Sequence, residues 1–234
     1  MISADSLKNR SQSLLELTKM SVKRKVQDWL RSEVVDDAPN YDERLFPNLK
    51  PPNGLILWLT GLSGSGKTTI ARGVERELKE RNCLVEVLDG DVVRTNLSKG
   101  LGFSREDREI NIRRLGFVAN LLSRNRVITI VAAISPYREA RDEVRKTTEN
   151  FIEVYINAPL EVCEQRDTKG LYAMAREGEI KAFTGINDPY EEPLNPDIVC
   201  YTSEETVADS VAKVIAELER LEYIPAKPEI DFYL

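Results

Sequence analysis

The sequence contains no histidine among its 234 residues. A catalytic imidazole base and a histidine-bearing metal site are therefore excluded within this chain. Cysteine is scarce, because only Cys83, Cys163 and Cys200 are present and no two of them form a C-x-x-C pair. An odd number of cysteines without such pairing predicts free thiols in a reducing compartment.

Long apolar runs are also missing. No run approaches the roughly 18 residues that span a bilayer, and no signal-peptide core opens the sequence. A formal net charge of -6 argues against nucleic acid or an anionic membrane as the main partner. Apolar residues make up 41% and charged residues 31%, which is typical of a globular protein with one α/β domain and an appendage. We therefore expect a cytoplasmic protein with neither a membrane nor a nucleic-acid partner.

A glycine-rich motif gives the first positive indication of function. It has the form G-x-x-x-x-G-K-[ST] and reads Gly61-Leu62-Ser63-Gly64-Ser65-Gly66-Lys67-Thr68. Glycines at this spacing let the backbone bend around a polyphosphate, so that N–H groups and the next helix N-terminus face its oxygens. Lys67 is then expected to neutralise the β- and γ-phosphates, and the Thr68 hydroxyl to ligate Mg²⁺. The apolar run before the motif and the helical pattern after it favour this interpretation over a chance glycine-rich turn.

Strand-like and helix-like runs alternate from Gly54 onward, which is typical of a parallel sheet covered by helices. Strands are predicted at residues 55–59, 84–88, 127–134, 151–156 and 198–200. Helices are predicted after the glycine-rich motif, along the face of Ile112 to Leu122, from Pro136 to about Asn150, from Pro159, and from a Thr202/Glu205 capping box to near Leu221. The predicted fold class is α/β: a three-layer P-loop NTPase fold with a five-stranded parallel sheet, helices on both faces and a lid insertion.

Three regions are predicted along the chain. Residues 1–53 form an N-terminal extension and linker, in which Val22, Val26, Trp29 and Leu30 recur at helical spacing beside basic residues. Such a helix could pack on the domain or on a second subunit, or dock a partner or a membrane surface. Residues 54–224 form the P-loop domain, and residues 225–234 a tail. Within the domain, residues 167–197 are rich in glycine and proline and carry too few apolar residues for a core, which predicts an active-site lid.

Two further groups of residues follow predicted strands, where ligands of open parallel sheets bind. Asp89 and Asp91 come after the second strand, and Ser135 comes after the third. A carboxylate at Asp91 could accept the proton of an attacking hydroxyl or hold Mg²⁺. Asp89 could hold the metal or only support Asp91, and a plain turn with two solvated acids is the alternative.

Cations and aromatic rings gather in two segments. Residues 94–114 contain six lysines and arginines around Phe103, and the lid adds further cations and Phe183. Alone, such a segment favours a solvated helix face. Beside a nucleotide site it predicts a pocket for a second anion, whose aromatic ring the two phenylalanines could sandwich.

Together these motifs closely resemble the adenylylsulfate kinase (APS kinase) family over about residues 54–224. The resemblance rests on residues 61–69, Leu88-Asp89-Gly90-Asp91, residues 101–108 with Asn111-Ile112, Ile134-Ser135-Pro136, Lys169-Gly170-Leu171-Tyr172 and Phe183-Thr184-Gly185-Ile186. It implies transfer of the ATP γ-phosphoryl group, with Mg²⁺, to the 3′-hydroxyl of adenosine 5′-phosphosulfate, giving PAPS for sulfate assimilation.

The resemblance also implies roles for individual residues. Asp91 corresponds to the base or metal-positioning acid, and Lys67 to the catalytic lysine. Ser135 corresponds to a serine described for the family as a phosphoserine intermediate, although direct in-line transfer needs no covalent step. Metal ligands are expected at Thr68, Asp89 and Asp91. The expected ATP contacts are Gly61, Ser63, Gly64, Ser65, Gly66, Lys67, Thr68, Thr69, Arg166 and Cys200. The expected adenylylsulfate contacts are Asp91, Arg94, Phe103, Arg108, Asn111, Ile134, Ser135, Lys169, Leu171 and Phe183.

The expected partners are ATP, adenylylsulfate and a second copy of the chain in a homodimer, with association to an ATP sulfurylase as a further option. Two features depart from the family pattern: Thr168 stands where proline is common, and residues 1–50 have no counterpart in the usual leader. Other small-molecule P-loop kinases, such as gluconate or shikimate types, and a catalytically inactive nucleotide-binding regulator remain alternatives.

Overall fold

The computed structural model describes residues 54–225. The predicted helix at Val22 to Leu30 and the tail from residue 226 lie outside this range. In chain order, the described elements are β1 (Leu55–Thr60), α2 (Lys67–Glu80), β2 (Val85–Asp89), α3 (Gly90–Asn96), α4 (Arg105–Arg124), β3 (Ile128–Ala132), α5 (Arg138–Arg145), β4 (Phe151–Asn157), α6 (Leu160–Arg166), α7 (Leu171–Arg176), β5 (Ile198–Tyr201) and α8 (Val207–Arg220).

The strands form one parallel sheet in the order β2-β3-β1-β4-β5. In the register, Leu57 of β1 lies between Ile130 of β3 and Ile152 of β4. The predicted five-stranded parallel sheet with helices is confirmed. Because all strands run in one direction, their carboxyl ends and the loops that follow them meet at one edge.

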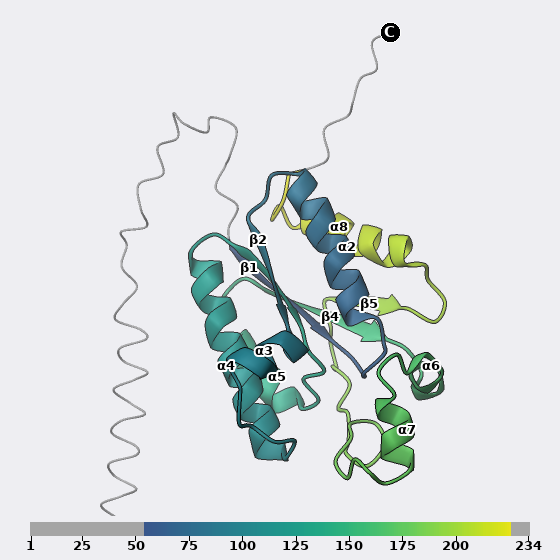
Figure 1. Cartoon of the computed structure of the whole chain (residues 1–234). Helices are drawn as coiled ribbons and strands as arrows, with labels where there is room; N and C mark the ends of the chain where they lie inside the picture. The colour runs from purple at the N-terminus through teal and green to yellow at the C-terminus, as the bar shows by residue number, and fades with distance from the viewer. Residues whose placement is uncertain (1–53, 226–234) are drawn as a thin grey trace, which may run out of the picture. The chain divides into compact units, whose positions relative to one another are not determined.

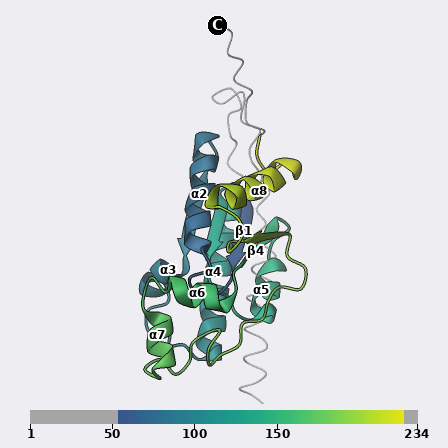
Figure 2. The same ribbon diagram turned by 90° about the vertical axis from the view of Figure 1, so that its right-hand side faces the viewer.

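Helices cover both faces of the sheet, with α2 and α8 on one side and α4 and α5 on the other (Figures 1 and 2). Alternation along β1 divides the core in two. Leu55, Leu57 and Leu59 pack in the cluster beneath α2 and α8. Ile56 and Trp58 belong to the cluster beneath α4 and α5. All five side chains are fully buried, so the central strand is apolar on both faces, as a sheet between two helical layers requires.

Three local predictions are wrong. Pro136 does not open a helix, because α5 begins at Arg138 and the Pro136 carbonyl instead accepts a hydrogen bond from the Glu191 N–H at 2.8 Å. The same helix stops at Arg145 instead of about Asn150, where the Thr147 hydroxyl donates to the Val144 carbonyl at 2.7 Å.

The third wrong prediction is the capping box of the last helix. Thr206 and Asp209 form that box at the start of α8. The Thr202 hydroxyl instead donates to the Ser65 carbonyl at 2.7 Å. The predicted end of this helix near Leu221 is confirmed, because α8 ends at Arg220.

Residues 167–197, which were predicted to form a lid and are called the lid below, contain more apolar packing than the sequence predicted. Tyr172, Ala175 and Phe183 pack with Ala158 and Cys163 in a small buried cluster. The rings of Tyr172 and Phe183 meet edge to face, with their centroids 4.8 Å apart. The expectation that this segment cannot build a core is therefore wrong. The lid rests on α6 through a few large side chains, which composition alone does not reveal.

Among residues 54–225, no helix is both long and apolar enough to cross a membrane. All three cysteines are free and buried, which confirms the predicted free thiols.

Close packing of α4 on α5 generates a stability prediction. A Cβ atom added at Gly116 would lie 2.5 Å from Val144 Cγ2. We expect Gly116→Ala to lower the free energy of unfolding by about 1–3 kcal/mol through overpacking, less the roughly 1 kcal/mol that alanine gains in a helix. Urea unfolding measures the difference.

The control places Gly116→Ala in a Val144→Ala background, where most of the clashing atoms are gone. There the same change should be neutral or stabilising. A loss of equal size in both backgrounds would show that the helix contact is not the cause.

Candidate active site

The loop between β1 and α2 turns sharply at its glycines. Gly61 and Gly66 have φ values of 152° and 106°. At Gly61 an added Cβ would lie 2.4 Å from the Ile156 carbonyl oxygen, so the neighbouring strand leaves no room for a side chain. The loop therefore runs close against β4, and α2 begins directly after it at Lys67. This is the strand, loop and helix order that a phosphate-binding loop requires.

Lys67 is buried with its ammonium group inside the loop. Its Nζ donates to the carbonyl oxygens of Gly61 at 3.0 Å and Leu62 at 2.6 Å. Burial lowers the pKa of Lys67 to about 8, although Asp91 and Asp89 nearby act in the opposite direction. A polyphosphate on the loop would replace these neutral carbonyl partners with anionic oxygens, which favour the charged form.

Asp89 and Asp91 make different contacts at the end of β2. The Asp89 carboxylate accepts from the Thr68 hydroxyl at 2.8 Å and caps α3 by accepting from the Asp91 N–H at 3.0 Å. The Asp91 carboxylate pairs with the Lys169 ammonium of the lid, and both side chains are exposed. Asp89 thus belongs with the phosphate loop, whereas Asp91 faces the lid. Helix α3 was not predicted, and its Asp89 cap is the sequence signal that could have revealed it.

The residues present fit a magnesium ion. In the described part of the chain, no group of three or more acidic or cysteine side chains could hold a metal alone. Mg²⁺ in nucleotide enzymes needs no such cage, because it keeps waters and takes phosphate oxygens together with one or two protein oxygens. The Thr68 hydroxyl and the Asp89 carboxylate, which lie in direct contact, are oxygen donors of this kind.

Side chains from α6, from the lid and from the residue after β5 donate hydrogen bonds to carbonyls of the phosphate loop. Besides bonding Ser65, Thr202 accepts from Arg166, whose Nη2 donates to the Thr202 carbonyl at 2.6 Å. The Arg166 Nη1 also lies 3.3 Å from the Gly64 carbonyl. Tyr172 of the lid donates its hydroxyl to the Ser63 carbonyl at 2.9 Å. These contacts engage carbonyls of the loop, and within the loop the Ser65 N–H donates to the Leu62 carbonyl at 3.2 Å.

Roles for Thr202 and Tyr172 were missed from the sequence. Thr202 follows directly after β5, and a residue at the carboxyl end of a strand is a recognisable signal. Tyr172 does not follow a strand, and only the folded lid brings its hydroxyl to the loop.

Three residues predicted for the second substrate, Arg94, Phe103 and Arg108, meet where α3 leads into α4, and a fourth, Asn111, lies one turn further along α4. Phe103 is exposed, and the Arg94 guanidinium carbon lies 4.5 Å from its ring centroid. Asn111 is buried, and its side-chain oxygen has no hydrogen-bond partner in the structure. Arg108 is also buried and donates to the carbonyls of Phe103 and Ala182, each at 2.8 Å, to Asp188 at 2.9 Å and to Thr184. Arg108 therefore ties α4 to the lid.

Other predicted site residues lie deeper. Phe183 is buried against Tyr172, and Leu171 and Ile134 are partly buried. Ser135 is 2% exposed, and its hydroxyl accepts from the Trp58 indole N–H at 3.0 Å. Cys200 is fully buried in the core beneath α2 and α8, and burial raises the pKa of its thiol to about 11. Thr69 is exposed next to Thr68 at the start of α2.

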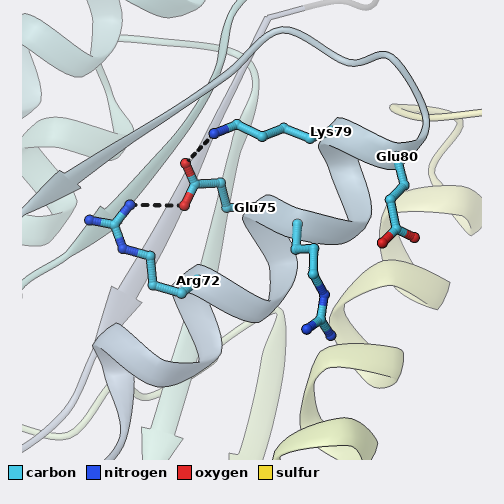
Figure 3. A pocket seen from close by; sticks show the side chains of 5 residues that line it. Arg72, Glu75, Lys79 and Glu80 are labelled. Atoms are coloured by element: carbon cyan, nitrogen blue, oxygen red, sulfur yellow. Dashed lines mark hydrogen bonds and ion pairs between the residues drawn. The ribbon is translucent and has the colours of Figure 1, made fainter.

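A shallow hollow on α2 is distinct from this site. Figure 3 shows Glu75 between Arg72 and Lys79, with an ion pair of 2.8 Å to each. Arg76 and Glu80 complete the lining. Arg72 lies three residues before Glu75, and Lys79 lies four residues after it, on one face of the helix. This spacing accounts for their pairing without a ligand.

Comparison of the fold with solved structures identifies the class of enzymes to which the chain belongs. The structure of the Mycobacterium tuberculosis APS kinase CysC in complex with AMPPNP and APS superimposes with a TM-score of 0.70 at 47% identity, over 72% of this chain and 99% of that one. A hexameric APS kinase from Thiobacillus denitrificans gives a TM-score of 0.59 at 32% identity, over 79% of this chain and 32% of that one. The fold and the loop define a kinase of the P-loop NTPase fold.

Sequence comparisons identify the family within this class of kinases. The family model for adenylylsulphate kinase matches residues 53–201. An adenylyl-sulfate kinase of Rippkaea orientalis is 65% identical over 175 residues, which cover 75% of this chain and 96% of the relative. The chain belongs to the adenylylsulfate kinase family.

The pKa of Lys67 leads to a prediction about proton uptake. With a pKa near 8 in the free protein, about half of the Lys67 side chains carry a proton at pH 8. A bound polyphosphate raises that pKa, so ATP binding should take up a substantial fraction of a proton per site at pH 8. Calorimetry in two buffers of different ionisation enthalpy measures the uptake.

Lys67→Arg is the control, since its guanidinium stays protonated throughout. Uptake at pH 8 that persists in this variant would assign the proton to another group.

Proposed function

We propose that the protein transfers the γ-phosphoryl group of ATP to the 3′-hydroxyl of adenosine 5′-phosphosulfate, giving PAPS. One observation carries the proposal: Asp91 pairs with Lys169 of the lid while its neighbour Asp89 contacts Thr68 of the phosphate loop. A carboxylate between the loop and the lid would meet an acceptor hydroxyl beside the γ-phosphate. Membership of the family supports the choice of acceptor.

The donor half of the reaction rests on the phosphate loop. Backbone N–H groups of residues 61–69 would bind the phosphates, and Lys67 would neutralise charge on the β- and γ-phosphates. Thr68 and Asp89 would hold Mg²⁺, which offsets the charge that develops on the transferring group. Arg166, which reaches the loop from α6, would contact the nucleotide. Cys200 can contribute only packing there, since it is fully buried.

The acceptor half rests on Asp91, the 94–111 segment and the lid. Asp91 would accept the proton of the 3′-hydroxyl as the hydroxyl attacks phosphorus in line. Arg94 and Lys169 supply positive charge for the phosphosulfate, and the exposed ring of Phe103 offers a stacking surface. The buried, unpartnered oxygen of Asn111 would accept a hydrogen bond from an adenine amino group once substrate binding exposes it. Arg108 and Phe183 would act mainly by shaping the lid that carries Leu171.

Ser135 fits direct transfer better than a phosphoserine intermediate. Its buried hydroxyl is bonded to Trp58, and among residues 54–225 no side chain that could remove its proton is hydrogen-bonded to it. Ser135 and Ile134 would contact the acceptor through the backbone of their turn.

The expected homodimer, the ATP sulfurylase association and the cytoplasmic location remain predictions. One relative, the APS kinase from Thiobacillus denitrificans, is hexameric.

An initial-rate assay tests the proposal. With MgATP, the wild-type protein should phosphorylate adenylylsulfate and not gluconate or shikimate. Lys67→Ala should lower kcat/KM about a thousandfold or more, because it removes charge stabilisation of the transition state. Turnover of a sugar acid instead would indicate another small-molecule kinase. ATP binding with no turnover of any acceptor would indicate a regulator.

Phe103 separates the two substrate sites. Phe103→Ala should raise the KM for adenylylsulfate tenfold or more, since stacking of a base on an aromatic ring contributes about 1–3 kcal/mol. The KM for ATP should stay unchanged. Phe117→Ala is the matched control, because Phe117 is a similarly exposed phenylalanine on α4. A rise confined to ATP would mean that the two sites are interchanged.

A further inference from the structure

A second buried arginine, Arg141 of α5, contacts three separate segments. Its Nε donates to the Glu153 carboxylate of β4 at 2.8 Å. One terminal nitrogen donates to the Ser135 carbonyl at 2.5 Å, and the other to the Glu191 carbonyl at 2.7 Å. The side chain is 2% exposed. Arg141 therefore joins the sheet, the turn after β3 and the end of the lid at one point.

The turn after β3 is strained where Arg141 holds it. Ser135 has a φ of 41°, which is uncommon for a residue with a side chain. Such a conformation persists only when surrounding contacts fix it. Trp58 holds the Ser135 hydroxyl and Arg141 holds its carbonyl, so both polar ends of this residue are fixed.

The end of the lid is anchored to the same place. The Glu191 N–H donates to the Pro136 carbonyl at 2.8 Å, and the Arg138 N–H donates to the Glu191 carboxylate at 2.9 Å. One residue earlier, the Tyr190 hydroxyl lies 2.9 Å from that of Thr60, directly before the phosphate loop. The lid thus returns to the sheet across the turn that carries Ser135.

We propose that Arg141 is a positioning residue for the acceptor: it sets the Ser135 turn and the end of the lid in one fixed relation. This inference rests on the proposed function, because it assigns the acceptor to the surfaces that Arg141 joins. No hydrogen bond or ion pair joins Arg141 to residues 61–69, Arg94 or Phe103. Its effect on the reaction therefore passes through Ser135 and Glu191.

Arginine is required here by geometry. The planar guanidinium presents donors in fixed directions and can reach three partners, whereas a lysine ammonium is a compact charge. Arg141→Lys keeps a cation beside the buried Glu153, so it avoids an unpaired buried carboxylate. The shorter reach of lysine should break the hydrogen bonds to the carbonyls of Ser135 and Glu191. The substitution therefore tests positioning more than charge.

The experiment compares Arg141→Lys with wild type and with Arg113→Lys, a change at an exposed arginine paired with Glu143 on the surface. Wild-type turnover of adenylylsulfate first establishes the proposed function. In Arg141→Lys, the KM for adenylylsulfate should rise about tenfold while the KM for ATP changes less than twofold, because the displaced turn and lid end bind the acceptor and not ATP. Arg113→Lys should match wild type.

A purely structural role would lower the active fraction, and so kcat, and leave both KM values unchanged. That result, or an equal rise in both KM values, would overturn the proposal.

Hydrogen exchange of the wild-type protein gives a measurement that does not depend on folding of the variant. The Glu191 amide should exchange as slowly as amides of β3, because a fixed anchor keeps its bond to Pro136 closed. The amide of Leu194, a residue that is 75% exposed, is the comparison within the same segment. Equal, fast exchange at Glu191 and Leu194 would contradict a fixed anchor.

Discussion

The parallel pairing of β1 with β3 and β4 is the constraint on which the site depends. It holds Thr60, Ala132 and Asn157 at the same edge of the sheet, so that three loops start side by side. Pairing of β2 with β3 adds Asp89 to this edge. The apolar side chains of β1, buried on both faces, hold this register in place. The chemistry needs residues distant in sequence to converge, and the sheet supplies that convergence.

Two buried arginines then tie residues 182–191 of the predicted lid to α4 and α5. Arg108 engages residues 182–188, and Arg141 engages Glu191. The Arg108 contacts occupy four of its five N–H donors. An arginine that was predicted from the sequence as an anion ligand, Arg108, can thus serve the site by holding backbone carbonyls. Burial distinguishes the two roles, and composition does not.

Most of the fold could be predicted because its signals are local. The apolar strand at residues 55–59 and the glycine-rich motif define β1, its loop and α2 without tertiary information. Helix boundaries were less predictable where long-range contacts decide them. Thr202 has the spacing of a helix cap, yet in the fold its hydroxyl bonds Ser65, 137 residues away. The small core of the lid was missed because it depends on Cys163 and Ala158, which lie outside that segment.

The site residues were predicted from the sequence, and the structure shows which of them are in contact. It brings Thr68 to Asp89 and Asp91 to Lys169, whereas it buries Ser135 and Cys200. A crystal structure with a non-hydrolysable ATP analogue, Mg²⁺ and adenylylsulfate tests the account most directly. We expect the γ-phosphate to contact Lys67 and Thr68, and the adenylylsulfate 3′-hydroxyl to lie within hydrogen-bonding distance of Asp91. A hydroxyl bound at another carboxylate, or adenylylsulfate bound only on residues 61–69, would contradict it.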